Sequence, residues 1–313
     1  MAGDPMSHLM RCTQCGAEAV INMPQHRLKL CGDHLMAWTT KMVQKAIDRY
    51  DLFTPDERIL VAVSGGKDSL ALWDILHRLG YASEGLYIHL GIDHEGYSDR
   101  SQDAAQRFAD EHGLTLNIVN VQRAYGKSVI EAARRRRGGR TCSVCGMVKR
   151  HIMNRMAYEG GFAAIATGHN LDDETAVLLM NTLHWDGHYL SRQAPLLPSI
   201  HPRLARKVKP LVLLYEREMA AYALVRQIDY VMQECPYAEG ASSIFAKGIL
   251  NQIERQSPGS KHQFYLGFLR ARKGGLIASD ASADLPSETC AQCGQPTMAG
   301  GLCAFCRLWE AAE

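Results

Sequence analysis

The sequence has no long hydrophobic run. Nowhere do its 313 residues approach the ~20 consecutive apolar residues that a membrane-spanning helix requires, and the first eleven residues lack the apolar stretch of a secretory signal. These absences predict a cytoplasmic protein with no membrane partner. A large charge excess is absent too, because the 35 Lys and Arg residues are nearly balanced by 33 Asp and Glu residues, which gives a net charge of +2. Overall charge therefore does not indicate a nucleic-acid-binding protein, and local basic clusters are more informative.

Disulfides are not expected although the chain has ten cysteines. Thiols stay reduced in the cytoplasm, and these cysteines occur in short-spaced groups, which favours metal binding. Two groups each offer four ligands in two pairs, as a closed tetrahedral zinc site needs. They are Cys12, Cys15, Cys31 and His34 near the N-terminus, and Cys290, Cys293, Cys303 and Cys306 near the C-terminus. Four protein ligands leave no open position, so we expect structural rather than catalytic zinc.

The C-terminal group lies in a tail of about 28 residues. Such a segment is too short to bury a stabilising core. Structural zinc contributes ~10 kcal/mol or more to folding, so we expect metal to hold the tail together.

A third group has three thiols rather than four. Cys142 and Cys145 form a Cys-x-x-Cys pair, and Cys235 follows ninety residues later. Three thiols suit a [4Fe-4S] cluster whose remaining iron is open to a ligand such as hydrosulfide. They also suit persulfide chemistry, in which one cysteine carries sulfur and another resolves it as a disulfide, or a purely structural role. Spacing alone does not separate the cluster from the persulfide.

A glycine-rich segment follows an apolar run at 59–63 that predicts a buried strand. Its residues are Ser64, Gly65, Gly66, Lys67, Asp68 and Ser69. The glycines let backbone N–H groups approach an anion, and a helix expected to begin near Ser69 points its positive end at the same place. A Walker loop has four residues between its glycines and Ser or Thr after its lysine. The segment therefore predicts a nucleotide-phosphate loop of another kind, with a plain glycine turn as the alternative.

Alternating patterns surround this loop. Strands are expected at 59–63, 86–92, 114–121 and 163–167, and helices at 70–79, 99–111 and 147–159. This order predicts an α/β fold with a doubly wound parallel sheet. Ligands bind beyond the carboxyl ends of the strands in such sheets. The loops 64–69, 93–98 and 168–174 leave those ends, and the first and third together would enclose ATP.

The loop at 168–174 offers a glycine and three carboxylates. Gly168 permits close approach, while Asp172, Asp173 and Glu174 are able to hold Mg²⁺ or to move protons. Asn170 and Asp172 are also suited to capping the helix that follows. The two roles are compatible.

Ser-Gly-Gly-Lys-Asp-Ser at 64–69 resembles the PP-loop of ATP pyrophosphatases, which release pyrophosphate from ATP and adenylate an acceptor. Further motifs in order, at 91–99, 142–145, 168–174 and 234–236, together with both terminal zinc groups, resemble the tRNA 2-thiouridine synthetases of the TtuA type over nearly the whole chain. Cytidine thiolases of the TtcA type lack the two terminal zinc modules. Wobble-uridine thiolases are closer relatives and stay an alternative.

The resemblance implies roles for individual residues. It places ATP on residues 64–69 with Gly168 and His169, a [4Fe-4S] cluster on Cys142, Cys145 and Cys235, and one zinc on each terminal group. It gives catalytic roles to Asp173, as a base or metal ligand, and to Lys149, which lies one helical turn after Cys145. Without the resemblance, Lys149 would pass as a surface lysine.

The implied reaction is adenylation of the C2 oxygen of a tRNA uridine, with Mg²⁺ and the loop neutralising the departing pyrophosphate, followed by replacement with sulfur. The implied target is T-loop ribothymidine 54, and the implied sulfur donor is a ubiquitin-like carrier protein with a C-terminal thiocarboxylate. A homodimer is expected. The implied parts are a zinc module with a linker helix at 1–50, the PP-loop domain at 51–225, a helical extension at 226–285 and a zinc module at 286–313.

Two basic clusters are candidate tRNA contacts, because lysine and arginine neutralise phosphates without reading sequence. One comprises Arg134 to Arg137 and Arg140, and the other comprises Arg203, Arg206, Lys207 and Lys209. Two other functions stay open. A small-molecule adenylating enzyme leaves the three central cysteines unexplained, and a zinc RNA-binding protein with a degenerate nucleotide fold leaves the intact loop at 64–69 unexplained.

Overall fold

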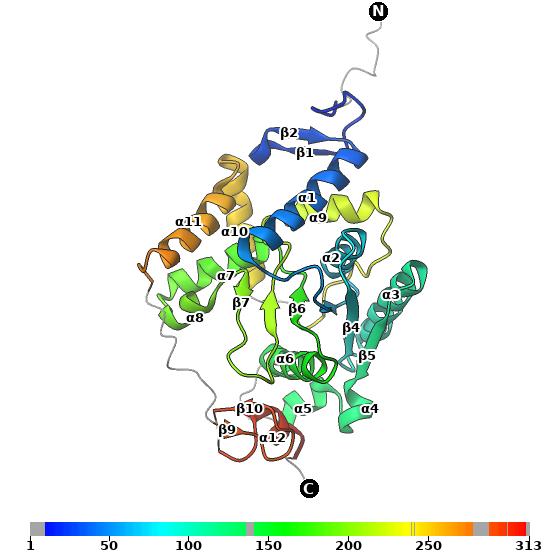
Figure 1. The fold of residues 1–313 in the computed structure, drawn as a ribbon, viewed down its shortest axis with the longest axis vertical. Helices are drawn as coiled ribbons and strands as arrows, with labels where there is room; N and C mark the ends of the chain where they lie inside the picture. Colours follow the sequence, from blue (N-terminus) through cyan, green and yellow to red (C-terminus); the bar gives the residue numbers. More distant parts are fainter. Residues whose placement is uncertain are drawn as a thin grey trace, which may run out of the picture.

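The computed structural model describes residues 10–135, 141–238, 240, 242–277, 288–298 and 300–310, except the side chain of residue 135. Its centre is a six-stranded sheet with strand order β5-β4-β3-β6-β8-β7 (Figure 1). The strands are β3 Ile59–Val63, β4 Ser83–His89, β5 Leu116–Asn120, β6 Ala164–Thr167, β7 Leu196–Leu197 and β8 Arg206–Val208. All neighbours pair in parallel except β7, which runs antiparallel at one edge.

The predicted doubly wound parallel sheet is confirmed, with differences at its ends. β4 starts and ends three residues before the predicted 86–92, because the chain turns out of the sheet at Gly91, where φ is +70°. β7 and β8 were not predicted. With two and three residues, they are too short to show a strand periodicity.

Helices cover both faces of the sheet. They are α1 Gly32–Tyr50, α2 Lys67–Arg78, α3 Tyr97–His112, α4 Val121–Tyr125, α5 Val129–Arg135, α6 Thr141–Glu159, α7 Leu171–Leu183, α8 Gly187–Arg192, α9 Glu216–Val225, α10 Ser242–Gln256, α11 Ser260–Lys273 and α12 Ala304–Glu310. Among the described residues, no helix is long and apolar enough to cross a bilayer. Short 3-10 helices occur at η1 Pro24–His26 and η2 His94–Gly96.

The alternation of side chains along β3 builds two cores. Ile59, Val61 and Val63 point to one face and pack with α2, α3 and α9. Leu60 points to the other face and packs with the α6 side, including Ala157. Helix α6 is longer than predicted, because it begins at Thr141 rather than 147. Its first two turns therefore carry Cys142 and Cys145.

Small modules lie at both ends of the chain. The N-terminal one is the hairpin of β1 Ile21–Met23 and β2 Leu28–Leu30 with the start of α1, and its Leu35 packs in one cluster with Val225 of α9. The C-terminal one contains β9 Glu288–Thr289, β10 Pro296–Thr297 and α12. Its Phe305 ring stacks on His151 of α6 at a centroid distance of 3.7 Å. Packing against the main domain therefore supports this tail in addition to any metal.

Candidate active site

The loop after β3 is built to receive an anion. The Ser69 hydroxyl accepts a hydrogen bond from the Ser64 N–H (3.0 Å) and donates one to the Gly66 carbonyl (3.0 Å), which closes the loop on itself. Gly65 has φ +76°, and a Cβ there would lie 2.3 Å from the Ser101 carbonyl oxygen. Only glycine fits that position. The N-cap of α2 is Gly66, which has no side chain to bind the first N–H groups of the helix.

A cavity of ≈ 340 Å³ opens where the strand order reverses, at the carboxyl ends of β3, β4 and β6. It is lined by Ser64, Gly66, Asp68 and Ser69 from the first loop and by Gly168 and His169 from the third. The two loops touch, because a Cβ on Gly168 would lie 2.9 Å from the Ser69 nitrogen. Both loops therefore line one cavity, and ATP binding between them stays a prediction. Tyr97 and Ser98, from the second predicted loop, line the same cavity.

Lys149 also faces this cavity. It stands on α6 one turn after Cys145 and lines the wall with Met153. Its charge acts on the thiol as well. Burial raises the pKa of Cys145, while the nearby Lys149 ammonium opposes that rise. Lys149 is therefore placed between the phosphate loop and the central cysteines.

The three carboxylates after β6 have different environments. Asn170 caps α7 by accepting the N–H groups of Asp172 (2.9 Å) and Asp173 (3.2 Å), and the Asp173 carboxylate accepts the Asn170 N–H (3.0 Å) in return. Capping of α7 by Asn170 is thus confirmed, and Asp173 takes part in the same capping box. Asp172 does not cap α7, however. It is buried, pairs with Lys261, and accepts the Glu216 N–H at 2.9 Å.

Glu174 is likewise removed from the candidate Mg²⁺ ligands. Its buried carboxylate pairs with Lys209 at 2.7 Å and accepts the Tyr265 hydroxyl at 3.3 Å. Of the three carboxylates that the sequence offered for Mg²⁺ or proton transfer, Asp172 and Glu174 are therefore engaged in internal ion pairs. Burial of a carboxylate requires a partner, and the partners lie on distant segments that the local sequence pattern does not reveal.

Sequence analysis did not identify two charged residues that lie near the phosphate loop. Glu216, in the first turn of α9, accepts a hydrogen bond from Lys67 Nζ at 2.9 Å. Lys247 of α10 pairs with Glu216 at 3.1 Å and with Asp173 at 2.6 Å. Burial raises the pKa of Asp68, and the negative charges of Asp173 and Glu216 add to the rise. No motif links these residues, so only the folded chain reveals the cluster.

The central cysteines lie together. Cys142 donates a hydrogen bond to the Tyr237 carbonyl at 3.2 Å, which holds the segment before α10 against the start of α6. Cys145 and Cys235 are half-buried and pack in one apolar cluster with Tyr97. Burial raises the pKa of Cys145, and Cys235 and Cys142 contribute to the rise. Three soft donors at one place fit an iron-sulfur cluster.

The terminal groups have a different geometry, which fits a single ion. Within the described ranges, only these two groups bring their ligand atoms within 4.8 Å of one another. The Sγ atoms of Cys15 and Cys31 are 3.8 Å apart, and those of Cys293 and Cys303 are 3.7 Å apart. A tetrahedron with ~2.3 Å zinc–sulfur bonds has edges of ~3.8 Å. The ligand atoms of Cys142, Cys145 and Cys235 do not all lie within 4.8 Å of one another.

The basic stretch after 203 is mostly engaged inside the protein. Arg203 donates to the Gly294 carbonyl at 2.9 Å, Arg206 pairs with Glu57, and Lys209 pairs with Glu174. Burial lowers the pKa of Lys207. Three of these four basic side chains are therefore engaged in contacts within the protein. Of the other basic cluster, Arg134 is exposed, and the side chain of Arg135 with Arg136, Arg137 and Arg140 lies outside the described residues.

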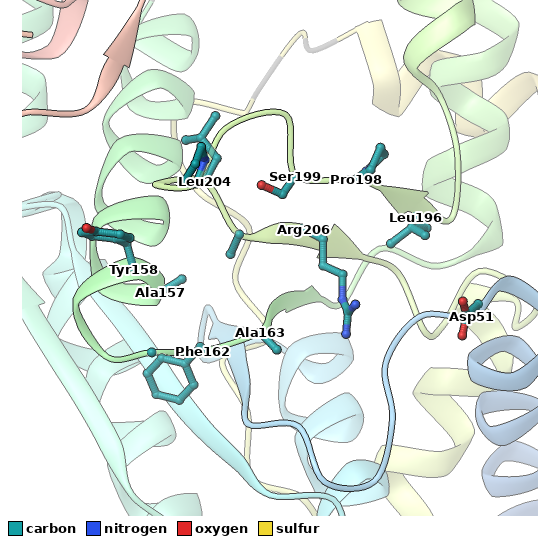
Figure 2. A pocket seen from close by; sticks show the side chains of 13 residues that line it. Asp51, Ala157, Tyr158, Phe162, Ala163, Leu196, Pro198, Ser199, Leu204 and Arg206 are labelled. Carbon is teal, nitrogen blue, oxygen red and sulfur yellow. The ribbon is translucent and has the colours of Figure 1, made fainter. Parts of the chain in front are cut away.

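A second cavity, of ≈ 590 Å³, lies at the amino ends of β6 and β8. Figure 2 shows Arg206 between Phe162 and Leu196 in its wall. Nucleotides bind at the carboxyl ends of such strands. This cavity is therefore separate from the phosphate loop.

Comparisons with known proteins agree with this geometry. A PP-loop domain family matches residues 37–238, and the N-terminal LIM domain of 2-thiouridine synthetase TtuA matches residues 11–36. The chain is 48% identical to the tRNA-5-methyluridine(54) 2-sulfurtransferase of Thermus thermophilus, covering 96% of this chain and 92% of that protein. Identity to the protein of the same name from Pyrococcus horikoshii is 43%, covering 96% and 94%.

One solved structure is similar throughout. The U34-tRNA thiolase NcsA from Methanococcus maripaludis, solved with its [4Fe-4S] cluster, superimposes with a TM-score of 0.75 at 25% identity. The match covers 91% of this chain and 96% of that one. The similarity thus includes the helices around the sheet as well as the sheet itself.

Proposed function

Because this chain belongs to the TtuA-type family of PP-loop tRNA 2-sulfurtransferases, we propose that it replaces the C2 oxygen of ribothymidine 54 in the tRNA T loop with sulfur, at the expense of ATP. One observation carries the chemistry. Tyr97 and Lys149 line the cavity of the phosphate loop and also neighbour the central cysteines. This neighbourhood supports a reaction in which nucleotide activation and sulfur delivery would meet at one place.

The phosphate loop would bind the triphosphate of ATP through the open N–H groups at the start of α2. The apolar side chains Leu86, Ile88 and Met153 line the same cavity and suit the adenine ring. Attack by the uridine C2 oxygen on the α-phosphorus would form the adenylated base and release pyrophosphate. Asp68 and Asp173 are the candidate Mg²⁺ ligands, because a divalent cation would neutralise two carboxylates that repel each other.

Cys142, Cys145 and Cys235 would hold a [4Fe-4S] cluster, which when bound supplies one iron free to accept a sulfur ligand. Lys149 would stabilise the negative charge on the AMP phosphate as the adenylate is displaced. Asp173 would bind Mg²⁺ or take a proton from the base. A persulfide on the same cysteines is the alternative route, and iron analysis of active protein separates the two.

Further features complete the proposal. Two structural zinc ions are supported by the ligand spacing of the terminal groups. A ubiquitin-like carrier with a C-terminal thiocarboxylate as sulfur donor, a homodimer, and a cytoplasmic location rest on the family resemblance. The parts of the chain would be those expected from sequence, at 1–50, 51–225, 226–285 and 286–313.

Mass analysis of nucleosides tests the function. Reconstituted protein is incubated anaerobically with ATP, Mg²⁺, a sulfide source, and either an acceptor-T-arm RNA that carries ribothymidine or an anticodon stem-loop. We expect 2-thioribothymidine in the first RNA and no thiolation of the second. The target base must be partly unstacked from the tRNA elbow at a cost of a few kcal/mol, which phosphate contacts along the arm would offset. Sulfur at the wobble uridine alone would instead support the activity named for the Methanococcus protein.

A further inference from the structure

A chain of alternating charges connects helix α10 to the phosphate loop. It begins at Lys247, whose Nζ lies 2.6 Å from Asp173 Oδ1 and 3.1 Å from Glu216 Oε2. The other oxygen of Glu216 lies 2.9 Å from Lys67 Nζ, and Lys67 reaches the neighbouring Asp68 at 3.1 Å. Each lysine thus contacts two carboxylates, and Glu216 joins the two lysines.

The geometry is held by packing rather than by the ion pairs alone. Ala246 and Leu250 of α10 are buried against Ala176 of α7, which places Lys247 above the start of α7, where Asp173 stands. Burial by itself would lower the pKa of Lys247, but the adjacent Asp173 and Glu216 carboxylates outweigh it and raise that pKa. The lysine therefore stays charged. The neighbouring Lys261–Asp172 pair is buried, and Asp172 accepts the Glu216 N–H at 2.9 Å, so this pair supports the backbone at the start of α9.

We propose that Lys247 is a positioning residue for the ATP-dependent step, holding the Asp173 carboxylate in place and, through Glu216, the Lys67 ammonium of the phosphate loop. The proposal deepens the proposed function and rests on it. Three carboxylates, Asp68, Asp173 and Glu216, face two lysines at the site that must accept a polyphosphate. Removing the Lys247 charge would leave Asp173 and Glu216 without their shared partner. The two carboxylates would then repel each other and the ATP phosphates, and Glu216 would no longer be held in place beside Lys67.

The test separates this role from a merely structural one. Lys247→Met keeps the length of the side chain and removes its charge, Lys247→Arg restores the charge, and Lys273→Met removes an exposed charge at the end of α11 as the matched control. Binding of the Mg²⁺ complex of a non-hydrolysable ATP analogue is measured by calorimetry, and kcat and KM are measured for ATP and for tRNA. The zinc and iron content of each variant is determined alongside.

We expect Lys247→Met to weaken analogue binding about tenfold or more and to lower kcat, with KM for tRNA and the metal content unchanged. Lys247→Arg should recover most of the affinity, and Lys273→Met should match the wild type. The double variant of Lys247→Met with Asp173→Asn should lose less in kcat than the product of the two single losses, because each change breaks the same contact.

Two results would overturn the proposal. One is wild-type affinity and kcat in Lys247→Met. The other is a loss of analogue affinity and kcat in Lys247→Met that accompanies a lowered unfolding temperature and that Lys247→Arg does not restore. Because the binding assay needs no tRNA, a wild-type protein that binds the analogue but thiolates no RNA would refute the proposed function while the affinity series still decides the role of Lys247 in nucleotide binding.

Discussion

The two adjacent glycines of the phosphate loop should respond differently to alanine. A Cβ on Gly65 would lie 2.3 Å from the Ser101 carbonyl oxygen, and the residue has φ +76°. A Cβ on Gly66 would meet only the Ser64 hydroxyl, at the ordinary distance of 3.5 Å. The left-handed conformation costs a non-glycine residue ~1–2 kcal/mol, and overpacking against backbone adds ~1–3 kcal/mol because the obstacle is not a side chain that rotates away.

The Gly65→Ala penalty of roughly 2–5 kcal/mol would lower the unfolding temperature by roughly 4–20 °C, using ~2–4 °C per kcal/mol for a domain of this size. Thermal unfolding followed by far-UV circular dichroism measures this change, and analogue binding by calorimetry measures the effect on the loop. Gly66→Ala should keep the stability of the wild type, although its methyl group lies in the nucleotide cavity. Equal unfolding temperatures for the two variants would refute the close approach of Gly65 to α3.

Three other outcomes are expected. Alanine at Cys142, Cys145 or Cys235 should abolish thiolation and iron binding while leaving zinc content unchanged; a thiolating triple variant would rule out both the cluster and the persulfide, and active wild-type protein without iron would favour the persulfide. The products should be AMP and pyrophosphate, with Asp68→Ala weakening ATP use and sparing both metals, and stoichiometric ADP would contradict the loop assignment. Burial lowers the pKa of His262 to about 4, so its contribution to stability should be complete above ~6.5, its unfolded pKa, and fall as pH drops toward 4. His262→Gln should remove that part of the acid dependence of the unfolding temperature, and an unchanged profile would disprove the assignment.

Features encoded within a few residues were predictable. The strand at 59–63 followed by two glycines predicted the phosphate loop, because a buried strand and a turn are both local patterns. The two terminal four-ligand groups were predictable for the same reason, since paired ligands with two residues between them already share one face of a tight turn. The roles proposed for Lys149 and Asp173 came from the family resemblance, because spacing alone does not indicate them.

The tertiary structure decided which charged groups are free to act. Asp172, Asp173 and Glu174 are consecutive, yet only Asp173 remains at the site, because Lys261 and Lys209 neutralise the other two inside the core. Arg203, Arg206 and Lys209 likewise form contacts with distant segments of the protein. A buried charge must find an opposite charge, and in this chain that partner comes from a helix or loop distant in sequence. The packing of α10 on α7 likewise places Lys247 beside Asp173, near the phosphate loop. No pattern in the sequence indicates this packing.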